Sequence, residues 1–373
     1  MSKQASGQAI IQEFESWSKK KYAEDGDPIG LQVGSLNKKI NKVMTTLDVL
    51  PTVVEEAIRE EVDLIIAHHP ILYKPLKKIN LDTEQGKMIA QLIKHDITVY
   101  AAHTNLDVAP GGVNDMLAEA LGLTNTEVLV KTFKESYKKI AVFVPSTHES
   151  EVREALGQAG AGFIGGYSNC TFSSGGTGRF KPTEGTNPYL GEQGKVEAVD
   201  EVKIESIFPA DEQTKILRAV LKAHPYEEVA YDIYPLENEA KSYGLGRIGY
   251  LKNEMSLEEF ANLTKEKLGS KGVRIVGDLS STVKKVAVLG GDGNKFISVA
   301  RFSGADVFVS GDIYYHVAHD AMIEGLQIID AGHNIEKIMI EGVRKKLQTV
   351  MTEKKYSTEV IGSKVDTDPF QFK

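Results

Sequence analysis

The sequence is poor in cysteine and contains neither a long apolar run nor a low-complexity stretch. Its one cysteine, Cys170, excludes an internal disulfide framework and a metal site built from thiolates. Because no apolar run is long enough to cross a bilayer and the first residues lack the apolar core of a signal peptide, we expect a cytoplasmic protein without membrane contact. The formal charge of −8 and the pI near 5.7 argue against general nucleic-acid binding.

The composition is that of a globular protein, and the sequence predicts a clear alternation of strands and helices. Its 373 residues are 41% hydrophobic and 26% charged, which predicts two or three domains. An amphipathic helix is expected at 8–22. It is followed by strands at 43–47, from 62 and at 97–102, and by helices at 51–61, 83–95 and 113–121. This alternation favours a parallel sheet with helices on its faces.

The pattern changes near residue 130. Strands are predicted at 139–144, 202–208 and 229–234, and helices at 150–159 and 210–223, around a Gly/Ser/Thr-rich region at 160–194. This β-α-β-β-α-β-like order predicts a ferredoxin-like α+β insert. After residue 246 the α/β alternation resumes. We therefore expect α/β lobes at 1–130 and 242–373, interrupted by an insert at 131–241.

The last part of the chain repeats the first at a constant offset. Lys42, Ala57 and Asp63 recur as Lys285, Ala300 and Asp306. The second apolar strand ends in Ser310-Gly311-Asp312 where the first ends in Ala67-His68-His69. Unrelated βαβ units can share such a period by chance, whereas duplication would make the outer segments two similar lobes of one unit.

The stretch from Val62 to Pro70 reads as a buried strand that ends in two imidazoles. Ligands of open α/β sheets bind at the carboxyl ends of the strands, so His68 and His69 are candidates for a metal site. The alternative is two loop histidines without a role. Six of the nine histidines fall at or just after predicted strand ends, namely His68, His69, His103, His316, His319 and His333, which favours the metal site.

Carboxylates accompany these histidines at the strand ends. Asp48 and Asp107 belong to the first lobe, and Asp312, Asp330 and Glu336 to the second. Imidazoles with carboxylates suit Zn²⁺, Mn²⁺ or Fe²⁺ better than Ca²⁺. So many ligands exceed the needs of one ion, and two ions bridged by a carboxylate could activate a water for hydrolysis. Alternatively, Asp107 only forms a turn, and Glu336 is only a carboxylate in a first helical turn, where the helix dipole favours it.

Other candidates carry less weight. His103 is either a direct ligand or a donor that holds Asp107, and we favour the donor. His316 and His319 lie on a predicted helix, where surface exposure competes with a place for His316 in the lining of the pocket. The run from Gly290 to Gly293 either cradles a phosphate or makes a tight turn.

These residues together resemble a known family. The segments that carry the resemblance are 30–34, 64–70, 103–107, 310–312 and 332–336, and the family is the GTP cyclohydrolase I type 2 homologue family, also called Ngg-interacting-factor-three-like. The resemblance implies two divalent ions per chain, zinc in preference to iron or manganese, on His68, His69, Asp107, His333 and Glu336. The family's tryptophan-aspartate-asparagine is here Gly26-Asp27-Pro28-Ile29, so a role for that asparagine does not carry over.

The insert is similar to PII and CutA-type domains, and His224-Pro225-Tyr226-Glu227-Glu228 matches the motif that closes that fold. The resemblance also implies a homohexameric ring. Three functions follow as hypotheses. The leading one is a dinuclear metal-dependent hydrolase that uses a metal-activated water, GTP cyclohydrolase-like by resemblance. The alternatives are a metal-dependent regulatory protein that binds a nucleotide or phosphate without turnover, and a metal buffer.

Overall fold

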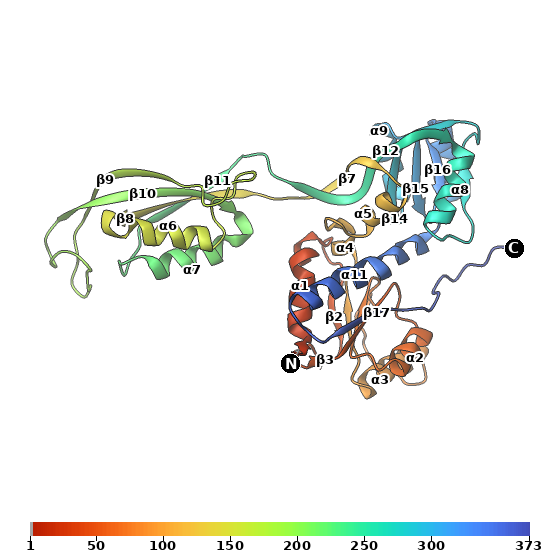
Figure 1. Ribbon diagram of the computed structural model, residues 1–373, viewed down its shortest axis with the longest axis horizontal. Helices are drawn as coiled ribbons and strands as arrows, with labels where there is room; N and C mark the ends of the chain where they lie inside the picture. The colour runs from red at the N-terminus through yellow and green to blue at the C-terminus, as the bar shows by residue number, and fades with distance from the viewer. Residues whose placement is uncertain (1–2) are drawn as a thin grey trace. The chain divides into compact units, whose positions relative to one another are not determined.

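The computed structural model describes residues 3–373 and divides into two compact units (Figure 1). One unit is formed by the chain up to Phe133 together with Tyr243–Lys373, and the other is Lys134–Ser242. The domain boundaries predicted from the sequence, after residues 130 and 241, stay predictions. Among the described residues, no helix is both long and apolar enough to span a membrane.

The first lobe is built around a five-stranded sheet in the order β17-β4-β5-β6-β2. Strands β17, β4, β5 and β6 are parallel, and β2 is antiparallel to β6. All four residues of β5 are buried, as predicted for a strand covered on both faces. The elements of this lobe are β1 (Ala5–Ser6), α1 (Gly7–Trp17), η1 (Lys20–Tyr22), β2 (Gly30–Val33), β3 (Lys39–Ile40), β4 (Lys42–Thr46), α2 (Pro51–Arg59), β5 (Leu64–Ala67), α3 (Glu84–Lys94), β6 (Thr98–Ala101), α4 (Thr104–Val108), α5 (Val113–Ala120) and β17 (Glu359–Gly362).

The second lobe is built around a six-stranded sheet in the order β13-β16-β15-β14-β12-β7. Its central strands β14, β15 and β16 are parallel, and β12 and β13 run antiparallel to their neighbours β14 and β16. Its elements are β7 (Thr124–Lys134), β12 (Ser242–Ser256), α8 (Leu257–Lys267), β13 (Arg274–Val276), β14 (Thr282–Asp292), η4 (Asn294–Phe296), α9 (Ile297–Phe302), β15 (Val307–Gly311), α10 (Tyr315–Ile323), β16 (Gln327–Asp330), η5 (His333–Lys337) and α11 (Ile338–Glu353).

The predicted similarity of the lobes is confirmed down to a hydrogen bond. The parallel register pairs Val43 with Leu64 in the first lobe and Val286 with Val307 in the second, at the offset seen in the sequence. In each lobe an aspartate before the second strand accepts hydrogen bonds from backbone amides at the start of the first. Asp63 accepts from Lys42 at 3.1 Å, and Asp306 accepts from Lys285 at 2.7 Å.

The two lobes exchange strands, so that they form one unit. Strand β7 follows the helices of the first lobe but joins the second sheet, and β17 follows α11 but pairs with β4 in the first sheet. Helix α11 packs against β4, β17 and α5 (Figure 1). A single buried core contains residues of both lobes, among them Phe14, Leu117, Val288 and Met339. This direct packing brings the strand ends of the two lobes together.

The insert has the predicted ferredoxin-like topology. Its antiparallel sheet has the order β11-β8-β10-β9, and α6 and α7 pack on one face over a core of Ile140, Val142, Val152, Ile216 and Val220. Strand β9 lies in the Gly/Ser/Thr-rich region, where no strand was placed from the sequence, because an exposed edge strand carries no apolar alternation. The elements are β8 (Tyr137–Pro145), η2 (Ser146–His148), α6 (Glu149–Gln158), β9 (Phe172–Phe180), β10 (Glu197–Pro209), η3 (Ala210–Glu212), α7 (Gln213–Ala223) and β11 (Tyr231–Leu236).

Candidate metal centre

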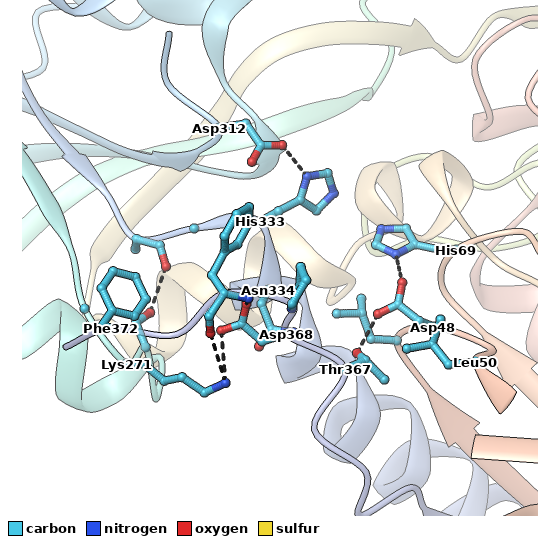
Figure 2. Close-up of a pocket in the computed structure, with 17 residues that line it drawn as sticks. Asp48, Leu50, His69, Lys271, Asp312, His333, Asn334, Thr367, Asp368 and Phe372 are labelled. Carbon is cyan, nitrogen blue, oxygen red and sulfur yellow. Dashed lines mark hydrogen bonds and ion pairs between the residues drawn. The ribbon is translucent and has the colours of Figure 1, made fainter. Parts of the chain in front are cut away.

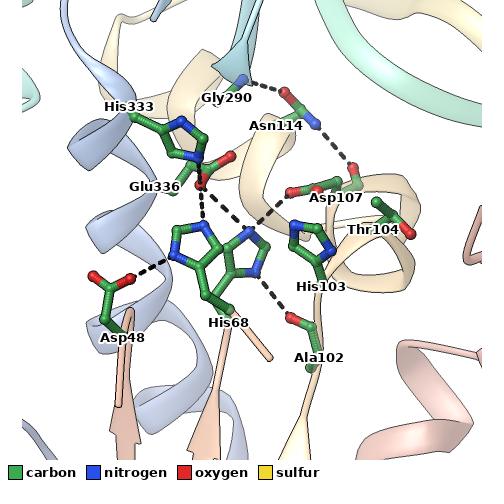
Figure 3. A network of polar contacts seen from close by, with 12 residues as sticks. Asp48, His68, Ala102, His103, Thr104, Asp107, Asn114, Gly290, His333 and Glu336 are labelled. Carbon is green, nitrogen blue, oxygen red and sulfur yellow. Dashed lines mark hydrogen bonds and ion pairs between the residues drawn. The ribbon is translucent and has the colours of Figure 1, made fainter. Parts of the chain in front are cut away.

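Residues that follow three strands, β5, β6 and β16, converge where the two lobes meet (Figure 3). His68 and His69 follow β5, and His103 and Asp107 follow β6 at the start of α4. From the second lobe, η5 after β16 contributes His333 and Glu336. All of these residues lie in loops or helix starts that follow the carboxyl ends of parallel strands. Their convergence therefore follows from the sheet topology.

Each imidazole of the cluster is oriented through its Nδ1 atom. The Nδ1–H groups donate to Ala102 O from His68 (2.8 Å), to Asp48 Oδ1 from His69 (2.7 Å), to Asp27 Oδ1 from His103 (2.9 Å) and to Asp312 Oδ2 from His333 (2.6 Å). An imidazole whose Nδ1 is held in this way can offer the lone pair of Nε2 to an ion.

The Nε2 atoms and the carboxylates form groups that share Glu336. His68, Asp107 and Glu336 form one group, in which His68 Nε2 lies 3.6 Å from a carboxylate oxygen of each partner. His69, His333 and Glu336 form another, in which Glu336 Oε2 lies 3.1 Å and 3.2 Å from the two Nε2 atoms. His103 also has a ring nitrogen within 4.8 Å of ligand atoms of His68 and His69. Each group could hold a metal ion, with Glu336 between them.

Two buried polar atoms of the first group have no hydrogen-bond partner among the described residues. They are His68 Nε2 and Asp107 Oδ1, and both residues are almost completely buried. A buried polar atom left without a partner costs about 1–3 kcal/mol. A divalent ion bound by both atoms would remove this cost, so the donor set fits a metal.

The charges of the cluster are strongly coupled. Burial would raise the pKa of Glu336, but His68, His333 and His69 around it hold that pKa well below its ordinary value. Burial also opposes protonation of His69, but hydrogen bonds to Asp48 and Glu336 prevail and raise its pKa to about 10. The hydrogen bond to Glu336 raises the pKa of His333 to about 9. Burial raises the pKa of Asp107 to about 6. Without an ion, protons therefore take the place of a cation beside Glu336.

The glycines from Gly290 to Gly293 make room for the cluster. A Cβ atom on Gly291 would lie 2.7 Å from Glu336 Oε1, and one on Gly290 would lie 3.0 Å from Glu336 Cγ. A Cβ atom on Gly293 would lie 2.3 Å from Ser310 Oγ. Close approach of side chains thus accounts for these glycines, and Gly291 in addition has a φ of +71°, as the tight turn among the alternatives drawn from the sequence requires.

Asn114 on α5 links the two halves of the cluster. Its side chain is buried, donates to the backbone carbonyl of Asp107 at 3.1 Å and accepts from the backbone amide of Gly290 at 3.0 Å (Figure 3). Asp107 belongs to the first lobe and Gly290 lies beside Glu336 in the second. The amide therefore links the backbone of Asp107 to the loop that lies beside Glu336.

A cavity of about 550 Å³ opens beside one group only. His69, His333 and Asp312 line it, whereas His68, Asp107 and Glu336 do not. Its lining also includes Phe372 and residues 367–370 of the C-terminal segment; Phe372 packs on Gly272, and Asp366, which precedes these residues, pairs with Lys271 at 2.9 Å. Thr367 donates to Asp48 Oδ2, and Asp48 in turn holds His69 (Figure 2). The C-terminal segment thus touches the orienting network of the open group.

The structure brings together the five residues predicted as ligands, His68, His69, Asp107, His333 and Glu336. His103 joins them, but it pairs with Asp27 instead of holding Asp107, the role that we favoured from the sequence. His316 is exposed on α10 and is not among the residues that line the cavity, where the sequence reading had put it. Its ring contacts Tyr315.

Sequence reasoning missed the residues that orient the candidate ligands. Asp48 and Asp312 were noted at strand ends without a role, and Asp27 only as part of a segment that departs from the family pattern. Asp27 accepts from Thr104 N at 3.0 Å as well as from His103, and these bonds lower its pKa although burial opposes them. An aspartate retained in an otherwise altered segment was the one signal available. Asn114 and Thr367 had none.

Comparison with known proteins shows the family to which the chain belongs. A profile of Duf34/NIF3 (NGG1p interacting factor 3) matches residues 5–369. The chain belongs to the Duf34/NIF3 family. A Bacillus subtilis protein named GTP cyclohydrolase 1 type 2 homolog is 58% identical over 372 residues and covers 100% of both chains.

Solved structures of this family have the same fold. A Bacillus cereus protein related to NIF3 superimposes with a TM-score of 0.93 at 57% identity, covering 100% of both chains. A Staphylococcus aureus protein superimposes with a TM-score of 0.81 at 33% identity, covering 99% of both chains. The likeness extends over the lobes and the insert, so the three-part architecture is common to these proteins.

Proposed function

We propose that this Duf34/NIF3 protein binds two divalent metal ions and acts as a metal-dependent hydrolase. The observation that carries the proposal is the carboxylate of Glu336, which lies within 3.6 Å of Nε2 atoms of His68, His69 and His333. His68 and Asp107 would complete the buried site, and His69 and His333 the open one. Two such ions, zinc in preference to iron or manganese, would polarise a substrate and activate water at neutral pH.

The two sites would differ in role because only one adjoins the cavity. The buried group has no exposed imidazole, so its ion would serve as a fixed charge that organises Glu336. His69 and His333 border the cavity, so a substrate would meet their side of the cluster. Leu47, Leu50 and Phe372 give this cavity apolar walls that would exclude water from a bound substrate. His103, whose Nδ1 is hydrogen-bonded to Asp27, would act as a general acid or base beside the cluster.

The proposed substrate class is taken from the name of a relative. The Bacillus subtilis relative is called a GTP cyclohydrolase 1 type 2 homolog. We therefore propose GTP as the first substrate to test, with a panel of other nucleotides and phosphoesters beside it. The decisive experiment measures metal content and turnover of the purified protein. Less than one ion per chain, or unchanged turnover in a His68→Ala/Glu336→Ala variant, would refute the hydrolase.

A second candidate is a regulatory protein that binds its ligand without turnover. It is supported by the family description as an interacting factor and by the insert, which has a cavity lined by its own residues alone. Tight binding of a nucleotide or phosphate without metal-dependent turnover would favour it. Rapid reversible exchange of the ions without any ligand would favour a metal buffer.

We also propose a cytoplasmic homohexameric ring, as the resemblance to the family implied. The experiment is light scattering on the size-exclusion peak of the full chain, with and without metal. A monomer or dimer at micromolar concentration would contradict the ring and would leave the metal proposal intact, because all the groups described above lie within one chain.

A further inference from the structure

The motif His224-Pro225-Tyr226-Glu227-Glu228 plays no part in the metal cluster. It lies in the insert, between α7 and β11, and three of its residues line a cavity of about 290 Å³. The other walls are the end of β9, the β9–β10 loop and β10. This volume is at the small end of the range for ligand pockets in proteins.

Three aromatic rings from separate segments meet in this cavity. Tyr226 lies at the centre, with the ring centroid of Phe180 at 5.6 Å and that of Tyr189 at 6.2 Å. Phe180 ends β9, and Tyr189 belongs to the β9–β10 loop, in which it is half exposed. Aromatic faces carry the negative part of the ring quadrupole and attract cations.

Carboxylates supplement the rings. Glu201 on β10 accepts a hydrogen bond from the Tyr226 hydroxyl at 3.2 Å, and burial together with this carboxylate raises the pKa of Tyr226 to about 12. A Cβ atom on Gly178 would lie 2.1 Å from Glu201 Oε2, so this glycine lets the carboxylate lie against β9. Glu227 accepts from the backbone amide of Asn187 at 2.9 Å, which ties the β9–β10 loop to the motif.

The charge of the lining is negative. Three glutamates, Glu201, Glu227 and Glu228, face two cations, Arg179 and Lys181. Among the described residues, none of these five side chains is found in an ion pair, and the three carboxylates outnumber the two cations by one. A positively charged ligand would find aromatic rings and an excess of one negative charge here.

His224 supports the Tyr226 ring. Its Nε2–H donates to Phe143 O at 2.9 Å, and its Nδ1 accepts from the backbone amide of Tyr226 at 3.1 Å. Both ring nitrogens are thus occupied, and burial lowers the pKa of His224, so the imidazole stays neutral. It packs edge-on against Tyr226 at 5.1 Å and fixes that ring in place.

We infer that this cavity binds a small organic cation, an alkylammonium or guanidinium group, through the rings of Phe180, Tyr189 and Tyr226 and the carboxylate of Glu201. An organic cation is favoured over a hydrated metal ion because the walls are aromatic rather than rich in oxygen. The inference is independent of the proposed hydrolase, since every residue of the cavity belongs to the insert.

The test is calorimetric titration of the full chain with choline, agmatine and 3,3-dimethylbutan-1-ol, the neutral isostere of choline. We expect saturable binding of at least one cation, about tenfold tighter than any binding of the neutral alcohol. Equal affinity for choline and the alcohol, or no saturation by either cation at millimolar concentration, would overturn the inference. Binding of a nucleotide or inorganic phosphate that is lost in Arg179→Ala would also overturn it.

Matched variants locate the binding. Glu201→Gln and Tyr189→Leu should each weaken cation binding about tenfold. Glu205→Gln on the same strand and Tyr234→Leu on β11 lie outside the cavity lining and should leave it unchanged. Tyr189 is half exposed, so its replacement tests the inference even if changes at Tyr226 disturb the fold. Metal content should not change in any of these variants, which separates this site from the metal cluster.

Discussion

Glu336 Oε2 lies 3.1 Å from His69 Nε2, although the two residues belong to different lobes and are separated in sequence by the entire insert. The contact exists because β7 and β17 cross between the sheets and hold the strand ends of the two lobes together. The same carboxylate reaches His68 and His333. Glu336 is therefore the residue on which both proposed ions depend.

Replacement of Glu336 by Gln should abolish both ions. Asp107→Asn should remove only the buried ion, and His333→Ala only the open one, because each belongs to one group. Metal content after exhaustive dialysis, measured by mass spectrometry, checks the pattern. Two ions retained by Glu336→Gln would contradict a bridging role.

Metal binding should release protons and tighten as pH rises. The pKa values of His69 and His333 in the metal-free protein are about 10 and about 9, so both are protonated at pH 7 and each must lose a proton to bind an ion. For each proton released, affinity should rise about tenfold per pH unit until the pH passes these values. Titration calorimetry in buffers of different ionisation enthalpy measures the release, and its absence would refute the assignment.

The same pKa values predict the stability of the metal-free protein. Both exceed the ordinary histidine value of 6.5, so the stabilisation is fully present below that pH and is lost as pH rises through about 9 to 10. Thermal unfolding of the chelated protein should therefore occur at a lower temperature at pH 10 than at pH 7. A metal-loaded sample serves as the control and should change less.

Thr367→Val should weaken the open site alone. The substitution keeps the shape of the side chain but removes the hydroxyl that donates to Asp48, and a lost hydrogen bond to a charged group costs about 1.5–3 kcal/mol before relaxation. We expect roughly tenfold lower affinity for the ion at the open site and no change for the ion at the buried site, measured by competition with a chelator. Thr367→Ser keeps the hydroxyl and should bind as the natural chain does; equal loss in both variants would sink the idea.

Gly291→Ala should displace Glu336. The new Cβ atom would lie 2.7 Å from Glu336 Oε1 at a φ of +71°. Gly325→Ala is the matched control, since its φ is +80° and nothing lies within 4 Å of the added Cβ atom. Both variants bear backbone strain of about 1 kcal/mol, but only Gly291→Ala should lose metal. Equal metal content in the two would show that Glu336 tolerates the shift.

Asn114→Ala should destabilise the fold, because it leaves the carbonyl of Asp107 and the amide of Gly290 without their partner. Two unsatisfied buried groups predict a loss of about 2–4 kcal/mol in the free energy of unfolding. Denaturant titration measures it. Asn37→Ala, an exposed asparagine, should stay within about 0.5 kcal/mol of the natural chain.

The sequence by itself determined the local elements, the repeat and the candidate ligands. Strand β5 was predictable because its four buried apolar residues form an uninterrupted run, and the shared offset of Asp63 and Asp306 marked equivalent βαβ units. His68, His69, Asp107, His333 and Glu336 were found because strand ends are where an α/β sheet binds ligands, and because the family motifs cover them. Edge strand β9 escaped because nothing in it is buried against the core.

Only the tertiary structure decided how these residues act together. No local pattern shows that β7 and β17 change sheets, since strand partners are chosen by packing between distant segments. The tertiary structure also identified the groups that orient the candidate ligands, namely Asp48, Asp27, Asp312, the amide of Asn114 and the hydroxyl of Thr367. Hydrogen-bond geometry depends on positions in space that residue type and spacing do not encode, which is why the candidate ligands could be named from the sequence and their orientation could not.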